Sequence, residues 1–169
     1  MKCHGINPVS GRPLYSEFVS DFAALEQISL PSVHTILLIV ADSCTVCSEA
    51  IDRVAERLLS SGLTYVCVWG PDCERVHDIF DWAYIGDGST KPGFALMSTW
   101  HSDESIEEAI WFFITCAIPP DTEIEKTSYL AVAVGNKDWA VTIDSALSDV
   151  SAFTSRMVED DRETSGNVS

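Results

Sequence analysis

Uninterrupted runs of aliphatic and β-branched residues mark the strands expected in this chain. Residues 33–41 (VHTILLIVA) form a run of strand length with almost no polar alternation, and residues 63–69 (LTYVCVW) repeat the pattern. Such runs are typical of strands that are covered on both faces in a parallel sheet. We expect two further strands at 94–99 and 129–134. At least four strands are therefore predicted, and most of them should run parallel.

Apolar residues at helical spacing lie between these strands. The segments 45–60 and 73–81 each place their apolar residues on one helical face, and so does 106–114. Ser105 and Glu108 form a capping-box pair at the start of that third helix. The pattern predicts right-handed β-α-β connections between neighbouring parallel strands.

The remaining segments carry weaker patterns. We expect an irregular N-terminal arm over 1–16, because Gly and Pro recur among polar residues there, and a short helix over 17–28. Residues 139–143 fit a strand that returns antiparallel after a turn. The charged residues of 159–169 predict a disordered acidic tail. A single domain over 17–158 is therefore expected.

The pattern leaves some boundaries open. Residues 82–85 fit either the end of the second helix or a short extra strand, and 86–93 (GDGSTKPG) are typical of a loop. A last helix with Leu147, Val150 and Met157 on its inner face should follow the returning strand.

Strands and helices that alternate in this way are typical of three-layer α/β proteins. We therefore predict a Rossmann-like α/β fold with a mostly parallel sheet of four to six strands and helices on both faces. Ligands of such folds bind at the carboxyl ends of the strands. The residues that should meet at this rim are Asp42, Ser43, Cys44, Gly70, Asp72, Cys73, His77, Trp100, His101, Asp103 and Asn136.

The charge of the chain excludes several classes of partner. Its 169 residues include 26 Asp and Glu against 10 Lys and Arg, a net charge of −16, although 46% of the residues are hydrophobic. Such a surface repels nucleic-acid phosphates and anionic lipids. No run of 18 apolar residues is present, and residues 1–11 lack the layout of a signal peptide. We therefore expect a soluble cytoplasmic protein with no nucleic-acid or membrane partner.

Six cysteines offer the first candidate chemistry. Cys44 and Cys47 form a C-x-x-C pair between a strand and a helix, where the helix dipole favours a thiolate. This placement resembles that of thioredoxin-like proteins, and the resemblance implies thiol redox activity. The Thr45-Val46 insert and the lack of a preceding aromatic residue depart from that family's pattern. A thiol-redox protein is therefore one alternative.

Cys73 and His77 offer a possible metal site. They lie four residues apart, so a helix places them on one face, and with Cys44 and Cys47 they match a zinc ligand set. The predicted core is large enough to fold without a metal, and we expect no cofactor.

Cys73 near a helix N-terminus is also the best candidate nucleophile. His77 or His101 would act as its base, with Asp72 or Asp103 as the orienting carboxylate. Pairs of this kind also arise by chance in a chain with six Cys and four His. Phosphate chemistry is disfavoured, because neither G-x-G-x-x-G nor a P-loop motif follows the first strand. A cysteine-dependent or metal-dependent enzyme is the leading alternative, and whether the chain is an enzyme stays open.

Two segments carry a resemblance to a known family. Residues 69–78 (WGPDCERVHD) and 99–105 (TWHSDES) resemble the signature segments of a family of small, uncharacterised bacterial Rossmann-like domains. The resemblance spans residues 33–120 and implies an α/β fold in a bacterial cytoplasm. It implies no activity and no catalytic residues.

The third predicted helix and the rim carry more aromatic residues than one buried helical face requires. Trp111, Phe112 and Phe113 make more than one face of the third helix apolar, and Trp69 and Trp100 lie near the rim. These aromatics either fill the core or form a contact surface. An acidic body with an aromatic patch suits a protein partner with a basic face, or a second copy of the chain. We therefore predict a binding or accessory protein that takes a protein partner, or a small ligand at the carboxyl ends of the strands.

Overall fold

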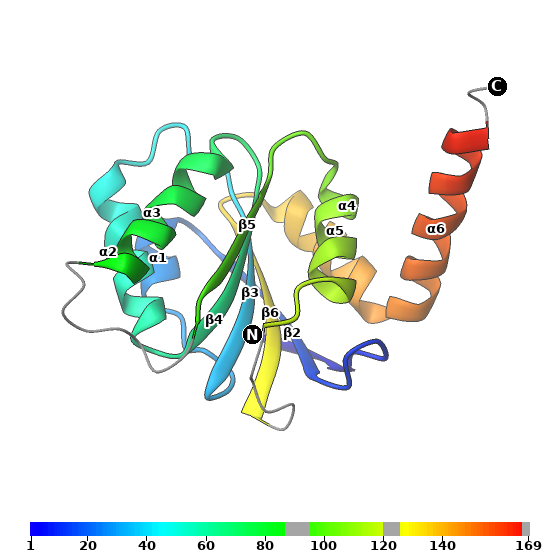
Figure 1. Ribbon diagram of the computed structural model, residues 1–169, viewed down its shortest axis with the longest axis horizontal. Helices are drawn as coiled ribbons and strands as arrows, with labels where there is room; N and C mark the ends of the chain where they lie inside the picture. The colour runs from blue at the N-terminus through cyan, green and yellow to red at the C-terminus, as the bar shows by residue number, and fades with distance from the viewer. Residues whose placement is uncertain (87–94, 120–125, 167–169) are drawn as a thin grey trace.

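The computed structural model describes residues 1–86, 95–119 and 126–166, with side chains through residue 160. Figure 1 shows the arrangement of its helices and strands. In chain order these are β1 (Lys2–Ile6), β2 (Pro13–Val19), α1 (Phe22–Glu26), β3 (His34–Val40), α2 (Ser48–Leu59), β4 (Leu63–Trp69), α3 (Cys73–Ile85), β5 (Met97–His101), α4 (Ile106–Thr115), β6 (Thr127–Val134), α5 (Lys137–Ser148) and α6 (Val150–Gly166).

The strands form one mostly parallel sheet. Their order is β1-β2-β6-β3-β4-β5, and every neighbouring pair is parallel except β1 and β2. The predicted α/β class and the mostly parallel sheet of four to six strands are confirmed. The strand expected over 94–99 is β5, which begins later in the chain.

Helices cover both faces of the sheet (Figure 1). Leu37 and Ile39 of β3 face the core that includes α1, α2 and α3, whereas Ile36 and Leu38 face the core that includes α4, α5 and α6. Successive strand residues point to opposite faces, so β3 needs an apolar residue at nearly every position. This burial explains the continuous apolar run from which the strand was predicted.

Residues 2–6 and 13–16 belong to the sheet, so the predicted irregular arm over 1–16 is wrong. β1 and β2 form an antiparallel hairpin, and β2 also pairs with β6 from Leu14 to Val19. Pro8 and Gly11 lie in the turn between the two strands instead of interrupting a strand. Gly11 has a φ of 72°, which favours glycine.

Two further predicted elements differ from the structure. The helix expected over 17–28 shrinks to α1, because its first residues complete β2. Residues 139–143 are helical in α5 and do not form an antiparallel strand. The side chain of Asn136 starts this helix by accepting hydrogen bonds from the backbone N–H groups of Asp138 and Trp139 at 2.9 and 3.4 Å. An N-cap was thus mistaken for a turn.

The second helix is longer than predicted, and the single last helix expected to hold Leu147, Val150 and Met157 is divided: Leu147 lies in α5, whereas Val150 and Met157 lie in α6. α3 includes 82–85, which excludes the extra strand. Most of the predicted loop 86–93 lies outside the described residues. The predicted disordered tail over 159–169 is wrong as far as Gly166, where α6 ends. None of the helices described is both long and apolar enough to cross a membrane.

The direction of the parallel strands gathers their carboxyl ends at one edge of the sheet. β3 and β4 lead into α2 and α3 on one face, whereas β5 and β6 lead into α4 and α5 on the other. Neighbouring strands whose helices leave to opposite faces open a crevice between them. This arrangement occurs between β4 and β5, between β3 and β6, and between β6 and β2, which leads into α1.

A partly buried polar cluster joins β1, β2 and α5. The side chain of His4 is 2% exposed, and its Nε2 lies 2.8 Å from Ser16 Oγ. Ser16 donates to Asp144 Oδ1 at 2.5 Å, and Lys2 Nζ donates to Asp144 Oδ2 at 2.8 Å. Burial lowers the pKa of His4 below its ordinary value of 6.5, although Asp144 opposes this effect.

His4 should make the stability of the fold depend on pH. The folded state binds a proton at His4 more weakly than the unfolded chain does, so the free energy of unfolding should fall between about pH 7.5 and about pH 5.5. His4→Gln removes this titration, and the variant should lose less stability over the same range. Urea unfolding at the two pH values measures the difference. Equal losses in both proteins would contradict this role of His4.

Candidate functional site

Arg75 on α3 ties together two loops at the carboxyl edge. Its Nε donates to Asp72 Oδ2 at 2.7 Å, and its Nη2 donates to the carbonyl oxygens of Ser43 and Val46 at 2.7 and 3.1 Å. Its Nη1 donates to Ser48 Oγ at 3.3 Å. The predicted rim residues Ser43 and Asp72 therefore belong to one hydrogen-bonded framework. The sequence prediction missed Arg75, although its spacing of three residues from Asp72 on a predicted helix was visible.

The turn from β4 into α3 brings the two loops into backbone contact. Gly70 has a φ of 115°, and a Cβ there would lie 2.2 Å from the carbonyl oxygen of Ala41. Asp72 has a φ of 64°, the one positive φ among the described non-glycine residues, and Asp tolerates this conformation well. Ser43 N donates to Pro71 O at 3.0 Å. Ser43 Oγ is buried and, within the described part of the chain, has no hydrogen-bond partner.

Cys73 begins α3 in an environment that disfavours a nucleophile. The residue is 1% exposed, and burial raises the pKa of its thiol, although backbone hydrogen bonds from His101 and Glu74 oppose the increase. The imidazoles of His77 and His101 make their hydrogen bonds with other side chains. Asp103 is exposed in the loop between β5 and α4. The structure therefore does not assemble the predicted thiol and base.

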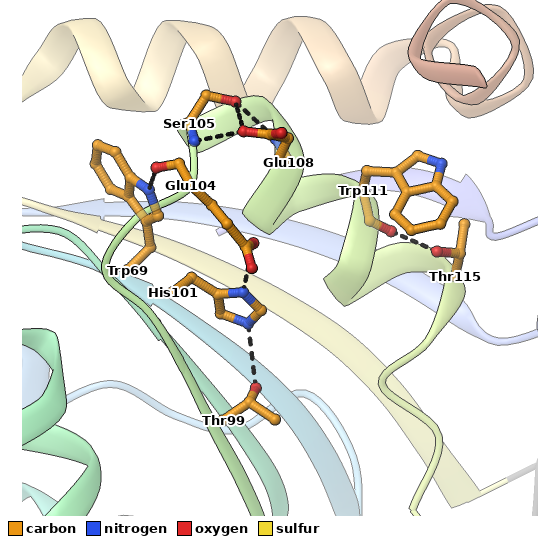
Figure 2. Close-up of polar contacts among 8 residues, drawn as sticks. All are labelled: Trp69, Thr99, His101, Glu104, Ser105, Glu108, Trp111 and Thr115. Carbon is orange, nitrogen blue, oxygen red and sulfur yellow. Dashed lines mark hydrogen bonds and ion pairs between the residues drawn. The ribbon is translucent and has the colours of Figure 1, made fainter. Parts of the chain in front are cut away.

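His101 lies at the end of β5 on the α4 side of the sheet. Its Nδ1 donates to Glu104 Oε2 at 2.7 Å, and Thr99 Oγ1 lies 3.2 Å from its Nε2 (Figure 2). The centroids of the His101 and Phe112 rings are 4.8 Å apart. Trp69 Nε1 donates to the carbonyl oxygen of Glu104 at 2.9 Å. These contacts hold the β5–α4 loop against the sheet, and Glu104 is a site residue that the sequence prediction missed.

His77 lies on the opposite face of the sheet. Its Nε2 is 3.0 Å from Ser98 Oγ, its Nδ1 is 3.0 Å from Asp78 Oδ1, and its ring centroid is 4.5 Å from that of the Trp100 ring. Because successive residues of β5 alternate between faces, Ser98 and Trp100 face α3 whereas His101 faces α4. The sheet therefore separates His77 from His101.

The remaining predicted candidates do not form one site. Cys44 and Cys47 are exposed free thiols, and a hydrogen bond with Asp42 raises the pKa of Cys44. Across the described residues, no three His, Cys, Asp or Glu side chains are placed to hold one metal ion. The predicted zinc ligands that therefore stay apart are Cys44, Cys47, Cys73 and His77. Asn136 is occupied as the N-cap of α5.

A groove of about 850 Å³ lies between α4 and α6, beside the His101–Glu104 pair. Figure 2 shows Glu104, Ser105, Glu108 and Trp111 on and beside the first turns of α4. The residues that line the groove are Glu104, Ser105, Glu107, Glu108, Trp111, Phe112, Arg156, Met157, Val158 and Asp160.

The groove combines negative charge with an apolar wall. Among the lining residues that the structure describes, four are acidic and one, Arg156, is basic. Glu108 accepts hydrogen bonds from Ser105 N and Oγ at 2.7 Å each, and these bonds lower the pKa of Glu108. The Glu108 carboxylate therefore stays ionised. The apolar part of the lining consists of Trp111, Phe112, Met157 and Val158.

The sequence pattern identified only one wall of this groove. Trp111 and Phe112 were predicted as a possible contact surface, and both line the groove. The acidic residues Glu104 and Glu107 beside an apolar helix were a visible signal that the prediction did not use. The wall from α6, including Met157, depends on helix packing that the sequence pattern does not specify.

Comparison with known proteins places the chain in a family. No curated protein matches it. A family model described as Domain of unknown function (DUF7684) matches residues 16–150, which contain both segments expected to resemble an uncharacterised family. The match runs from β2 through α5, whereas β1 and nearly all of α6 lie outside it. Because the matched region is most of the chain, this protein belongs to the DUF7684 domain family.

Proposed function

We propose that this protein is a binding protein that holds a basic, partly apolar segment of a protein partner in the groove between α4 and α6. One observation carries the proposal: the groove joins several carboxylates to an aromatic wall in a single concave surface. Concave apolar surfaces with a few convergent polar groups are typical of recognition sites. The groove also adjoins the carboxyl edge, through Glu104.

The side chains of the groove suit Lys and Arg residues of a partner. The carboxylate of Glu104 is exposed, and His101 holds it in place. Basic side chains form charge-assisted hydrogen bonds with carboxylates such as those of Glu104 and Glu107, and they stack on aromatic rings such as that of Trp111. Apolar residues of the same segment would pack against Phe112. An amphipathic helix presents both kinds of residue to a groove, so this mode of recognition fits best.

The charge of the whole chain supports the same kind of partner. A net charge of −16 attracts a basic segment over long distances and speeds its association at low ionic strength. It also opposes a second copy of the chain as the occupant, because two copies repel each other. The affinity should therefore fall as the salt concentration rises.

Binding is better supported than the alternative of a cysteine-dependent or metal-dependent enzyme. That enzyme would need the Cys73 thiol activated by the imidazole of His77 or His101. Cys73 is buried, which raises the pKa of its thiol, and the imidazole nitrogens of both histidines contact other side chains. The thiol-redox alternative is also disfavoured, because the raised pKa of Cys44 reduces its thiolate fraction.

A charge at Trp111 should abolish most of the binding to a basic probe. Trp111→Lys removes an aromatic contact and adds a like charge, so the affinity for a fluorescein-labelled Lys/Leu model helix should fall on the order of tenfold or more. Fluorescence anisotropy measures this affinity. The matched control is Trp82→Lys, because Trp82 is 72% exposed on α3, away from the groove.

Urea unfolding first establishes that both lysine variants are folded. A Glu/Leu helix of the same length should bind neither the wild type nor the variants. If Trp82→Lys and Trp111→Lys weakened binding of the Lys/Leu helix equally, the acidic surface in general would be responsible and the groove would not be the binding site.

The reactivity of the thiols distinguishes a binding protein from a cysteine-dependent enzyme. Iodoacetamide near neutral pH should leave Cys73 and Cys67 unmodified in the folded protein, because both are buried and burial raises both pKa values, that of Cys67 to about 12. Mass spectrometry of peptides should find label first at the four exposed thiols, Cys3, Cys44, Cys47 and Cys116. Faster labelling of Cys73 than of the exposed thiols would restore the enzyme alternative.

A further inference from the structure

Arg156 brings a positive charge to the α6 wall of the acidic groove. The carbon at the centre of its guanidinium lies 5.5 Å from the centroid of the Phe153 ring, which is buried three residues earlier on α6. A cation over an aromatic face is attracted to the ring. The N–H groups of a guanidinium lie in its plane, so contact through the face leaves them able to donate hydrogen bonds.

Arg156 has no counter-charge of its own in the part of the chain that the structure describes. No carboxylate there lies within ion-pair distance of its guanidinium. By contrast, Arg53 and Arg75 pair with Glu26 and Asp72 at 3.4 and 2.7 Å. A carboxylate brought by a partner could therefore pair with Arg156 without displacing one that the described residues supply.

Glu107 faces the same groove from α4 and is also without a partner. Its carboxylate makes no hydrogen bond or ion pair with another of the described residues, whereas the neighbouring Glu108 accepts from Ser105. Glu107 and Arg156 both line the groove, but they do not approach each other closely enough to pair. The groove therefore keeps opposite charges on opposite walls.

Asp160 limits the positive region of the α6 wall. It lines the groove four residues after Arg156, and residues at this spacing are neighbours on one helix face. A row of acidic residues on a partner would meet Asp160 as well and would be repelled. A single acidic residue opposite Arg156 fits this wall better.

We propose that Arg156 selects partner helices that carry one Asp or Glu among their basic residues. This inference rests on the proposed function, because it takes the occupant of the groove to be an amphipathic helix. Basic residues on the flank of that helix toward α4 meet carboxylates such as that of Glu107, and apolar residues between the flanks pack against Trp111. The acidic residue on the flank toward α6 accepts two parallel hydrogen bonds from the Arg156 guanidinium. A fully basic helix instead places a like charge there.

Replacements in the Lys/Leu model helix find the position that matches Arg156. One Lys at a time, on either flank of the Leu face, is replaced by Glu, and fluorescence anisotropy measures the affinity of each labelled helix for the wild-type protein. The tightest-binding member of this set is the single-Glu helix. It is compared with the Lys/Leu helix on variants of the protein.

Arg156→Gln should change the affinities for the two helices in opposite directions. It should weaken binding of the single-Glu helix about two- to fivefold, the range expected for loss of an exposed ion pair. It should strengthen binding of the Lys/Leu helix, because a like charge is removed. The matched control is Arg53→Gln, which removes the same charge from an exposed position on α2, on the other face of the sheet. That control should change both affinities in the same direction.

The outcomes distinguish failure of this inference from failure of the proposed function. If Arg156→Gln changed both affinities in the same direction, or if no single-Glu helix bound the wild type, the selection by Arg156 would be overturned while the groove remained a site for basic helices. If the Lys/Leu helix did not bind the wild type either, the proposed function and the inference would both be overturned.

A second measurement needs no variant and carries the test if urea unfolding shows that Arg156→Gln is not folded. The Nε–H resonance of Arg156 in heteronuclear NMR spectra of the wild type should shift more with the single-Glu helix than with the Lys/Leu helix. The Nε–H resonance of Arg53 is the internal control, because that group donates to Glu26. Equal shifts of the Arg156 resonance with the two helices would overturn the inference.

Discussion

Burial of both faces of the central strands is the constraint on which this structure depends. Every residue of β6 is buried, and β3 is buried from Thr35 to Val40. Such strands require helices on both faces, because otherwise half of their apolar side chains would contact water. The helices after β5 and β6 therefore cover the face that α1, α2 and α3 leave open. This division places α4 where α6 can face it across the groove.

The elements that could be predicted from the sequence are those with a local cause. The apolar run 33–41 contains β3, and Ser105 caps α4 in a complete capping box with Glu108. The N-terminal hairpin was missed because β2 is stabilised by β6, which is distant in the chain, and because turn residues such as Gly11 masked the strands. Pairing across the sheet thus outweighed local propensity.

The candidate site shows which side-chain contacts the predicted topology does not specify. Cys73, His77 and His101 lie on adjacent strand–helix units, so a common rim was a reasonable expectation. The alternation of side chains along β5 then puts the partners of the two histidines on opposite faces, and the start of α3 buries Cys73. Arg75 was missed because two of its four acceptors are backbone carbonyls of another loop, those of Ser43 and Val46.

The proposed recognition of a basic segment would use both the acidic surface and the groove between α4 and α6. Hydrogen exchange, measured by mass spectrometry with and without the Lys/Leu model helix, tests this claim most directly because it locates the binding site on the protein. Binding in the groove predicts slower exchange of backbone amides in 104–112 and 150–160, with little change elsewhere. Slower exchange confined to the carboxyl-edge loops at 42–47 and 70–72, or at no segment, would contradict it.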